Sequence, residues 1–415
     1  WTMDQFIADL TCYTHRLKER RLPFGGVTLC HSTNQDYGVL RCDRHLRTHW
    51  TNFAQALTSF GDYCDHQTAS SIDSDALTKK EEGWWLSNVE LNKDLKEILK
   101  PVLTARNNLR TLILDRNEFG RDNDDYDYDG VIFLCNLVES NSYLKRLSFH
   151  NNPMDNIVGI SRLCDAVAKH RSLEHLTLEN VGLGDDEYKL SMIMNAAKNL
   201  ECLGLAGNNI GSRGAAAVIT EFLTTNNDTT KIVYLRDNLF GDESAHLFAT
   251  LLRKNEHLRV VDIGGNGFSQ IGRMTIRNAL FDTSSLNAAV ESNHKAVVYI
   301  DESWLKDRLG VINCEGTPED NRQRKVFSTL YATADGTRLG QLLNDVPVGL
   351  MPKLLAYLQE FYLGDISRGM KKHAMESLQQ YNMVDFEEAF SRQTIITIVF
   401  EVLRSWNLPT LYENI

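Results

Sequence analysis

The sequence lacks any long run of apolar residues. Its strongest candidate, residues 395–403, is interrupted by Glu401 and is far shorter than the roughly 20 apolar residues that a membrane-spanning helix needs. We therefore expect no transmembrane span.

Positive charge is also scarce, because 44 Lys and Arg residues stand against 55 Asp and Glu residues, for a net charge of −11 at pH 7. Sequence-independent binding of nucleic acid requires a basic surface that neutralises phosphates. We expect no nucleic-acid partner, and a basic or mixed-charge protein suits this chain better.

The eight cysteines form no C-x-x-C pair and are scattered along the chain. This dispersal favours reduced, mostly buried thiols over a disulfide framework, and hence an intracellular protein of the cytoplasm or nucleus. Because the sequence begins at Trp1, an organelle is an alternative if a transit peptide has been removed. Cys42 and His45 have a spacing that zinc accepts, but no second close pair completes the motif, so a structural role is favoured.

Several catalytic motifs are absent. The sequence contains no G-x-x-x-x-G-K-[ST] phosphate loop, no G-x-S-x-G elbow and no H-E-x-x-H helix. No pattern brings a nucleophile together with a base, so we expect a protein that is not an enzyme.

What the sequence does contain is an internal repeat, L-x-x-L-x-L-x-x-N, whose last position returns about every 27–35 residues. The third copy has Val181 in place of the asparagine. The six copies are Leu109-Leu112-Leu114-Asn117, Leu144-Leu147-Phe149-Asn152, Leu173-Leu176-Leu178-Val181, Leu200-Leu203-Leu205-Asn208, Thr230-Val233-Leu235-Asn238 and Leu258-Val261-Ile263-Asn266.

Each copy predicts one strand followed by one helix. The L-x-L alternation has the period of two that is typical of a strand, and helical stretches follow, as at 211–223 and 241–252. The asparagine amide can satisfy backbone groups where the chain leaves the strand, so we expect a locally different turn at Val181. Such units bury their apolar faces only when they are stacked. The prediction is an α/β leucine-rich-repeat horseshoe with parallel strands on the concave face and helices on the convex face.

The repeat length and the helical second half resemble the ribonuclease-inhibitor-like leucine-rich-repeat proteins. Residues 281–293 and 297–300 also resemble passages in algal and protist members of that group, which mostly have no assigned activity. The resemblance implies a scaffold that binds proteins.

The prediction divides the chain into three regions: an N-terminal region at 1–83, the repeat solenoid at 84–300 and a helical region at 301–415. Degenerate copies precede the six, with Leu86, Val89, Leu91 and Asp94 in one and residues 24–32 in the other, and a polar excursion is expected at 61–83. Helical spacing at 324–331, 350–362, 371–381 and 386–403 predicts a terminal cap, which a repeat stack requires. An independent partner-binding module is the alternative for this last region.

The register of the strands also predicts a partner-binding surface, since residues between the inward leucines point to the concave side. The fourth strand carries small residues there, which predicts a depression between Glu179 and the pair Tyr234 and Arg236. Arg and Tyr are frequent anchors of interfaces. The predicted partner-binding residues are Arg116, His150, Glu179, Tyr234, Arg236 and Asp262.

An acidic insertion after Asn117 is a candidate calcium site. Asp125, Asp127, Asp129 and Gly130 match the start of a D-x-D-x-D-G loop, but Asn136 stands where a bidentate glutamate belongs. Calcium is one reading, and a solvated acidic loop before a helix N-terminus is the other. No other cofactor is expected.

These observations lead to one expectation and one alternative. We expect a non-catalytic protein-protein interaction scaffold, or a subunit of a larger complex, that uses the concave face of the repeats. The alternative is a GTPase-activating protein, because the Ran GTPase activators are similar in using such repeats. This chain lacks their long acidic tail, and no arginine finger can be assigned.

Overall fold

The structure is a computed structural model that describes residues 3–19, 27–30, 44–70, 82–89, 91, 93–104, 109–117, 128–154, 157–224, 227–300, 312–313 and 316–332. The chain forms two compact units, Trp1–Leu239 and Phe240–Ile415. Nine strands, β1 to β9, occur in one sheet in the order of the sequence.

The first unit alternates strands with helices along the chain. Its N-terminal elements are α1 (Met3–Lys18), β1 (Val27–Cys30), α2 (Arg44–Ser70), β2 (Glu82–Ser87) and α4 (Lys93–Thr104). The repeats follow as β3 (Leu109–Asp115), α5 (Tyr128–Ser140), β4 (Arg146–His150), α6 (Ile157–Lys169), β5 (His175–Glu179), α7 (Glu187–Ala196), η1 (Ala197–Asn199), β6 (Cys202–Gly204), α8 (Ser212–Thr224) and β7 (Ile232–Tyr234).

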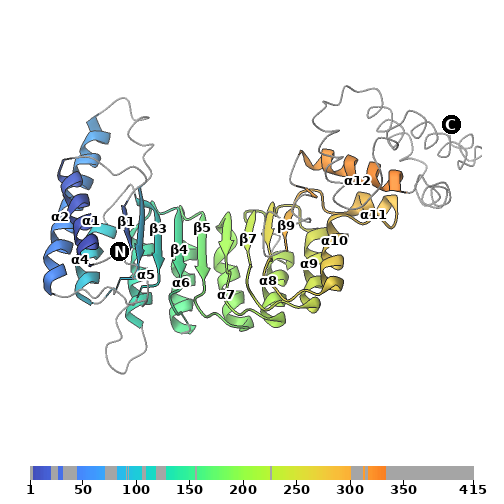
Figure 1. Cartoon of the computed structure of the whole chain (residues 1–415), viewed down its shortest axis with the longest axis horizontal. Helices are drawn as coiled ribbons and strands as arrows, with labels where there is room; N and C mark the ends of the chain where they lie inside the picture. The colour runs from blue at the N-terminus through green and yellow to red at the C-terminus, as the bar shows by residue number, and fades with distance from the viewer. Residues whose placement is uncertain are drawn as a thin grey trace, which may run out of the picture. The chain divides into compact units, whose positions relative to one another are not determined.

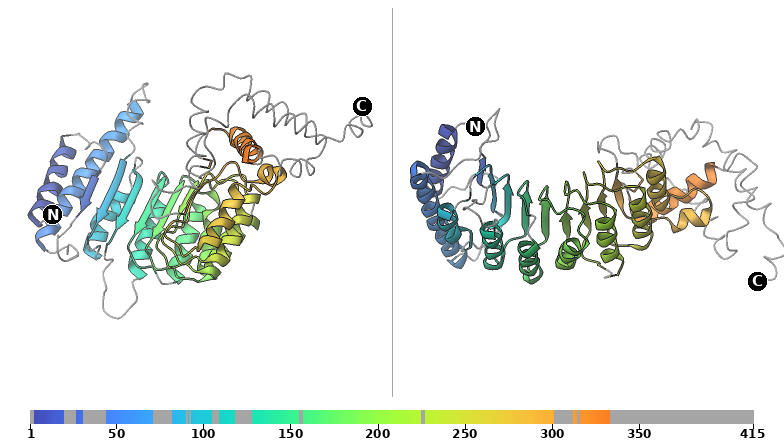
Figure 2. Two further views of the ribbon diagram at one scale, coloured as in Figure 1. Left: turned by 45° about the vertical axis from the view of Figure 1, so that its right-hand side comes forward. Right: turned by 90° about the horizontal axis from the view of Figure 1, so that it is seen from below.

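The leucines of the repeat occupy equivalent places in neighbouring parallel strands. Leu112 lies opposite Leu147, which lies opposite Leu176, and Leu176 lies opposite Leu203. All four are at most 2% exposed, as the strand periodicity predicts. Helices α5, α6 and α7 lie along one side of β3–β5 and cover this apolar side of the sheet (Figures 1 and 2).

Strands β2 to β8 end in the same backbone conformation. In these repeats the residue just before the asparagine position has a positive φ, a conformation that Asn, Asp and Gly adopt more readily than most residues. Arg116 is therefore unusual in this row. The values are Asn88 56°, Arg116 49°, Asn151 53°, Asn180 51°, Gly207 67°, Asp237 54° and Gly265 67°.

The buried asparagines connect consecutive repeats through their side-chain amides. Asn117 Oδ1 accepts the Val89 N–H at 3.0 Å, and Asn117 Nδ2 donates to the Leu86 carbonyl at 3.0 Å. The following asparagine does the same, since Asn152 accepts from the Asn117 N–H and donates to the Leu114 carbonyl. This ladder satisfies backbone groups that would otherwise be buried without partners.

Val181 interrupts the ladder but leaves the strand end unchanged. Asn180 keeps the usual positive φ, and the Val181 N–H is accepted by Asn208 Oδ1 at 3.0 Å. The difference predicted for this repeat comes only after Val181, where Gly182 and Gly184 have φ values of 79° and 68°.

The N-terminal helices close one end of the repeat core with aromatic side chains. Phe6 of α1, Trp50 and Phe53 of α2 and Trp84 of β2 form a chain of ring contacts with centroid distances of 5.8, 6.1 and 5.8 Å. Each of these side chains is at most 1% exposed. This cluster covers the first strands as a terminal cap must.

One expectation for the N-terminal region is wrong. In β2 the inward positions belong to Trp84 and Leu86, which lie opposite Leu112 and Leu114, so the degenerate copy is shifted and Val89 occupies the asparagine position. The repeat pattern was misaligned here because Trp84 stands where the pattern has its second leucine. The polar excursion expected at 61–83 begins inside α2, which continues to Ser70, and residues 71–81 lie outside the described residues.

The second unit contains α9 (Asp242–Lys254), β8 (Val260–Asp262), α10 (Gln270–Leu280), α11 (Leu286–Glu291), β9 (Val297–Tyr299) and α12 (Pro318–Ala332). Strands β8 and β9 are parallel, with Val261 opposite Val298. Phe240, Phe248 and Phe268 pack together, with centroid distances of 5.4 and 6.3 Å for the successive pairs.

Helix α12 is fastened to the second unit by a buried lysine. Lys325 is 3% exposed, and its Nζ donates to the carbonyls of Leu280 at 2.5 Å and Asn293 at 2.6 Å. Asn321 Nδ2 also donates to the His294 carbonyl at 2.9 Å. The expected helix at 324–331 is therefore part of α12, and its capping role stays a prediction, while the helices expected at 350–362, 371–381 and 386–403 lie outside the described residues.

These features define the fold class: an α/β leucine-rich-repeat protein with nine parallel strands that alternate with helices and with buried asparagines at the strand ends. In the described part of the chain, no helix combines the length and the apolar character needed to cross a membrane.

Candidate protein-binding face

The side of strands β2–β7 that points away from the helices is here called the open face. The register of the parallel strands fixes which of its side chains lie next to one another across the sheet. Neighbouring parallel strands are about 4.8 Å apart, so residues in one row are close neighbours. The three rows are Thr111-Arg146-His175-Cys202-Ile232, Trp85-Ile113-Ser148-Thr177-Gly204-Tyr234 and Ser87-Asp115-His150-Glu179.

His150 and Glu179 are a neighbouring acid–base pair on this face. Their Nε2 and Oε2 atoms are 3.9 Å apart, and their side chains are 28% and 32% exposed. Burial raises the pKa of Glu179, the nearby His150 opposes that increase, and the negative charge of Asp237 adds to it. The structure thus brings together two of the predicted site residues, half-shielded from solvent.

Asp115 is held by neutral side chains on both sides. Its Oδ2 accepts the Ser87 hydroxyl at 3.0 Å, and its Oδ1 accepts the Asn151 Nδ2 at 2.7 Å. Asn151 in turn accepts from Asn180 Nδ2 at 3.1 Å. These bonds tie the C-terminal ends of β2–β5 into a rigid polar row.

The depression predicted at β6 is filled by neighbouring side chains. A Cβ on Gly204 would lie 2.7 Å from the Cγ2 of Thr177, and a Cβ on Gly207 would overlap the side-chain amide of Asn180. The glycines therefore make room for Thr177 and Asn180, which lean over them from the preceding repeat. Their small size serves packing between repeats.

Tyr234 and Arg236 flank this region from the other side. Tyr234 lies opposite Gly204 and is half-buried. The Arg236 side chain is 22% exposed, and its Nε is 3.4 Å from the Oδ2 of Asp237. Arg116 is exposed at the end of β3.

Asp262 differs from the other predicted partner-binding residues. It belongs to the second unit, is 1% exposed, and its Oδ1 accepts the Gly264 N–H at 2.9 Å. This carboxylate stabilises the turn that follows β8, so we leave it out of the open face.

The sequence reasoning missed Trp85. This side chain is 42% exposed on the open face and lies opposite Ile113 of β3. The sequence analysis assigned the wrong register to β2. It therefore did not identify Trp84 as the inward residue and Trp85 as its neighbour on the open face. The signal that could have found it is the 28-residue offset between Trp85 and Ile113, which matches the offset between Val89 and its partner Asn117.

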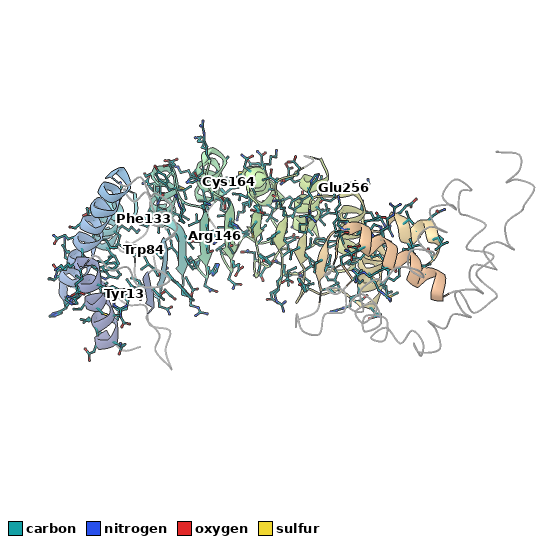
Figure 3. The ribbon with its side chains drawn as sticks, turned by 90° about the horizontal axis from the view of Figure 1, so that it is seen from above. Tyr13, Trp84, Phe133, Arg146, Cys164 and Glu256 are labelled. Carbon is teal, nitrogen blue, oxygen red and sulfur yellow. The ribbon has the colours of Figure 1, made fainter. Side chains whose placement is uncertain are left out.

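Figure 3 shows Arg146 on the strand side of the repeats and Cys164 on the helix side. Arg146 is exposed, and no described carboxylate lies within 4.0 Å of its guanidinium. Its charge helps to lower the pKa of His175, for which burial is the larger cause.

The predicted calcium ligands are not brought together by anything described. Asp125 and Asp127 lie outside the described residues, as does Cys42, and Asp129 is in α5 with its side chain undescribed. Within the described ranges, no group of three His, Cys, Asp or Glu side chains could hold a metal ion. The calcium site stays a prediction.

Comparison with known proteins adds no assignment: neither a model of a protein family nor a curated protein matches the chain.

Proposed function

We propose that this chain is a non-catalytic protein-protein interaction scaffold, or a subunit of a larger assembly, that holds a protein partner on the open face. The proposal includes that the repeats belong to the ribonuclease-inhibitor-like type. The observation that carries it is the composition of the open face, where Trp85, Tyr234 and Arg146 belong to strands whose inward side chains are buried, and Arg116 is exposed just after β3. Trp, Tyr and Arg are the residues most enriched among the anchors of interfaces.

The rigidity of the platform supports the same proposal. The asparagine ladder and the polar row at Asp115 fix the strand ends before any partner arrives. A preformed surface loses less conformational freedom on binding than a flexible one, so more of the contact energy contributes to affinity. A preformed surface suits a scaffold, and binding a partner on it requires no catalytic group.

The experiment compares two double variants of the full chain. Tyr234→Ala with Arg236→Ala changes the open face, while Tyr188→Ala with Arg171→Ala removes the same residue types from the helix α7 surface and the loop before β5, where both are exposed. Partners that co-purify with the native chain are identified and quantified for each variant. We expect recovery to fall by at least about tenfold, or about 1.4 kcal/mol, for the first variant alone.

Equal recovery of the same partner by both variants would contradict the proposal. A parallel measurement of GTP hydrolysis by candidate GTPases, with and without the chain, covers the GTPase-activating alternative. An increased hydrolysis rate would favour that alternative over the scaffold.

A further inference from the structure

The N-terminal half of the open face has an apolar anchor point beside a positive charge. Trp85 is 42% exposed, and Ile113 lies directly opposite it in the same row. Most described large apolar residues of the sheet point inward and are buried, so this pair is an exception. An exposed tryptophan on a rigid strand offers a large contact area that needs little ordering.

The positive charge comes from Arg146 on β4. It lies in the row next to that of Ile113, on the strand beside it, with Thr111 as its direct neighbour in β3. Arginine presents a planar fork of donors that matches a carboxylate. An exposed arginine one strand from an apolar anchor can therefore recognise an acidic side chain close to an apolar one.

Three carboxylates with described side chains in or beside this part of the face are engaged by other groups. Glu174 pairs with Lys145 at 3.3 Å, and Glu201 pairs with Lys231 at 3.1 Å. The hydrogen bond and charge of Lys231 lower the pKa of Glu201 more than Arg146 does. Asp115 is bound by Ser87 and Asn151. The positive charge of Arg146 is thus left for a partner, although the whole chain is acidic.

We propose that the face formed by Trp85, Ile113 and Arg146 binds a segment of a partner protein that carries a bulky apolar side chain next to a carboxylate. The inference rests on the proposed scaffold function and adds the chemistry of the partner. The apolar side chain packs on Trp85 and Ile113, and the carboxylate pairs with Arg146. A basic side chain placed at the same position would be repelled by the charge of Arg146.

The test selects binders for the intact chain from a library of random short peptides and measures the affinity of the selected peptides by fluorescence anisotropy. We expect enrichment of Asp or Glu beside Leu, Ile, Phe or Trp. Trp85→Ala and Arg146→Glu should each weaken binding by at least about tenfold, which is the loss typical of an interface anchor. Arg146→Lys should weaken it less, because the charge is kept.

Matched controls lie on the helix side of the first unit. Tyr188→Ala removes an aromatic ring that is 65% exposed, and Lys169→Glu reverses an exposed charge at the end of α6. Both should bind the selected peptides as the native chain does. Circular dichroism of every variant checks that loss of binding is not loss of folding.

Basic or uncharged selected peptides, no selected peptides, or acidic peptides that bind Trp85→Ala and Arg146→Glu unchanged would each overturn the inference. The proposed scaffold function has its own readout in the recovery of the native partner. Loss of recovery in the Tyr234 and Arg236 double variant, without any acidic peptide binding, would leave the scaffold standing and remove only this inference.

Discussion

Asn208 binds Val181 across two repeats: the side-chain Oδ1 of Asn208 accepts the Val181 N–H at 3.0 Å. The Nδ2 of the same amide donates to the Leu178 carbonyl at 2.7 Å, and Asn208 is fully buried. One side chain therefore satisfies both a donor and an acceptor of the preceding strand end. The Val181 repeat receives this bond from the next repeat just as the repeat of Asn117 does, where the Asn117 N–H donates to Asn152 Oδ1.

Replacing this amide should be costly. Asn208→Ala leaves the Val181 N–H and the Leu178 carbonyl buried without these partners, and each such group costs about 1–3 kcal/mol. We expect the free energy of unfolding to fall by about 3 kcal/mol, measured by urea denaturation. Asn195→Ala, at an exposed site within helix α7, is the control and should change it by less than about 0.5 kcal/mol. Equal effects of the two substitutions would show that the ladder does not stabilise the fold.

Substitutions at two glycines with positive φ distinguish the cost of backbone strain from the cost of steric crowding. Gly182 has a φ of 79° with nothing within 4 Å of an added Cβ, whereas an added Cβ on Gly207 would overlap Asn180. Gly182→Ala should cost only the left-handed penalty of about 1–2 kcal/mol. Gly207→Ala should cost more, because Asn180 must also leave its bond to Asn151. Thermal unfolding measures both, and a larger loss for Gly182→Ala would count against the packing described at β6.

The attachment of α12 predicts that substituting Lys325 affects the stability of this helix much more than substituting Lys295. Lys325→Met keeps an apolar stem but withdraws the donor from the buried carbonyls of Leu280 and Asn293, so hydrogen exchange in α12 should become faster by at least about tenfold. Lys295→Met breaks only an exposed pair with Glu256 at 3.1 Å, which is worth about 0–1 kcal/mol. Protection of α12 that is unchanged in Lys325→Met would mean that the lysine does not fasten this helix.

His294 should make the stability of the second unit depend on pH. Burial, and then the charge of Lys325, lower the pKa of His294 from 6.5 to about 4. Since Nε2 donates to the Val290 carbonyl at 2.9 Å, the Nδ1 that faces Lys325 Nζ at 3.3 Å carries no proton. The unfolded chain therefore takes up the proton at higher pH than the folded chain does, and the free energy of unfolding falls as the pH drops from 6.5 to about 4.

The measurement for this residue is urea denaturation across that pH range with the native chain and His294→Gln. The substitution removes the titrating group, so the dependence on pH should become flatter. An identical dependence in both proteins would assign it to other groups.

The sequence predicted the repeated part of the fold well, because one period controls both burial and hydrogen bonding there. Leu112, Leu147 and Asn152 all occupy their predicted places. The prediction failed at β2, where Trp84 replaces a leucine and Val89 replaces the asparagine, so that neither marker of the register remained.

The candidate site was only partly predictable for a related reason. Strand periodicity indicates which side chains share the open face, and both His150 and Glu179 lie there, 3.9 Å apart between Nε2 and Oε2. It says nothing of how side chains lean toward the next repeat, which is why Thr177 and Asn180 fill the expected depression. The burial of Asp262 depends on a turn bond to Gly264 that no spacing rule reveals.

The central claim is that a protein partner binds the open face, and cross-linking tests it most directly. A photoreactive amino acid is placed at Ser148, in the middle of the open face, and in a second protein at Val158, which is 46% exposed on α6. With the native partner present, we predict a cross-linked product from position 148 and none from position 158. Cross-linking from position 158 alone would contradict the account.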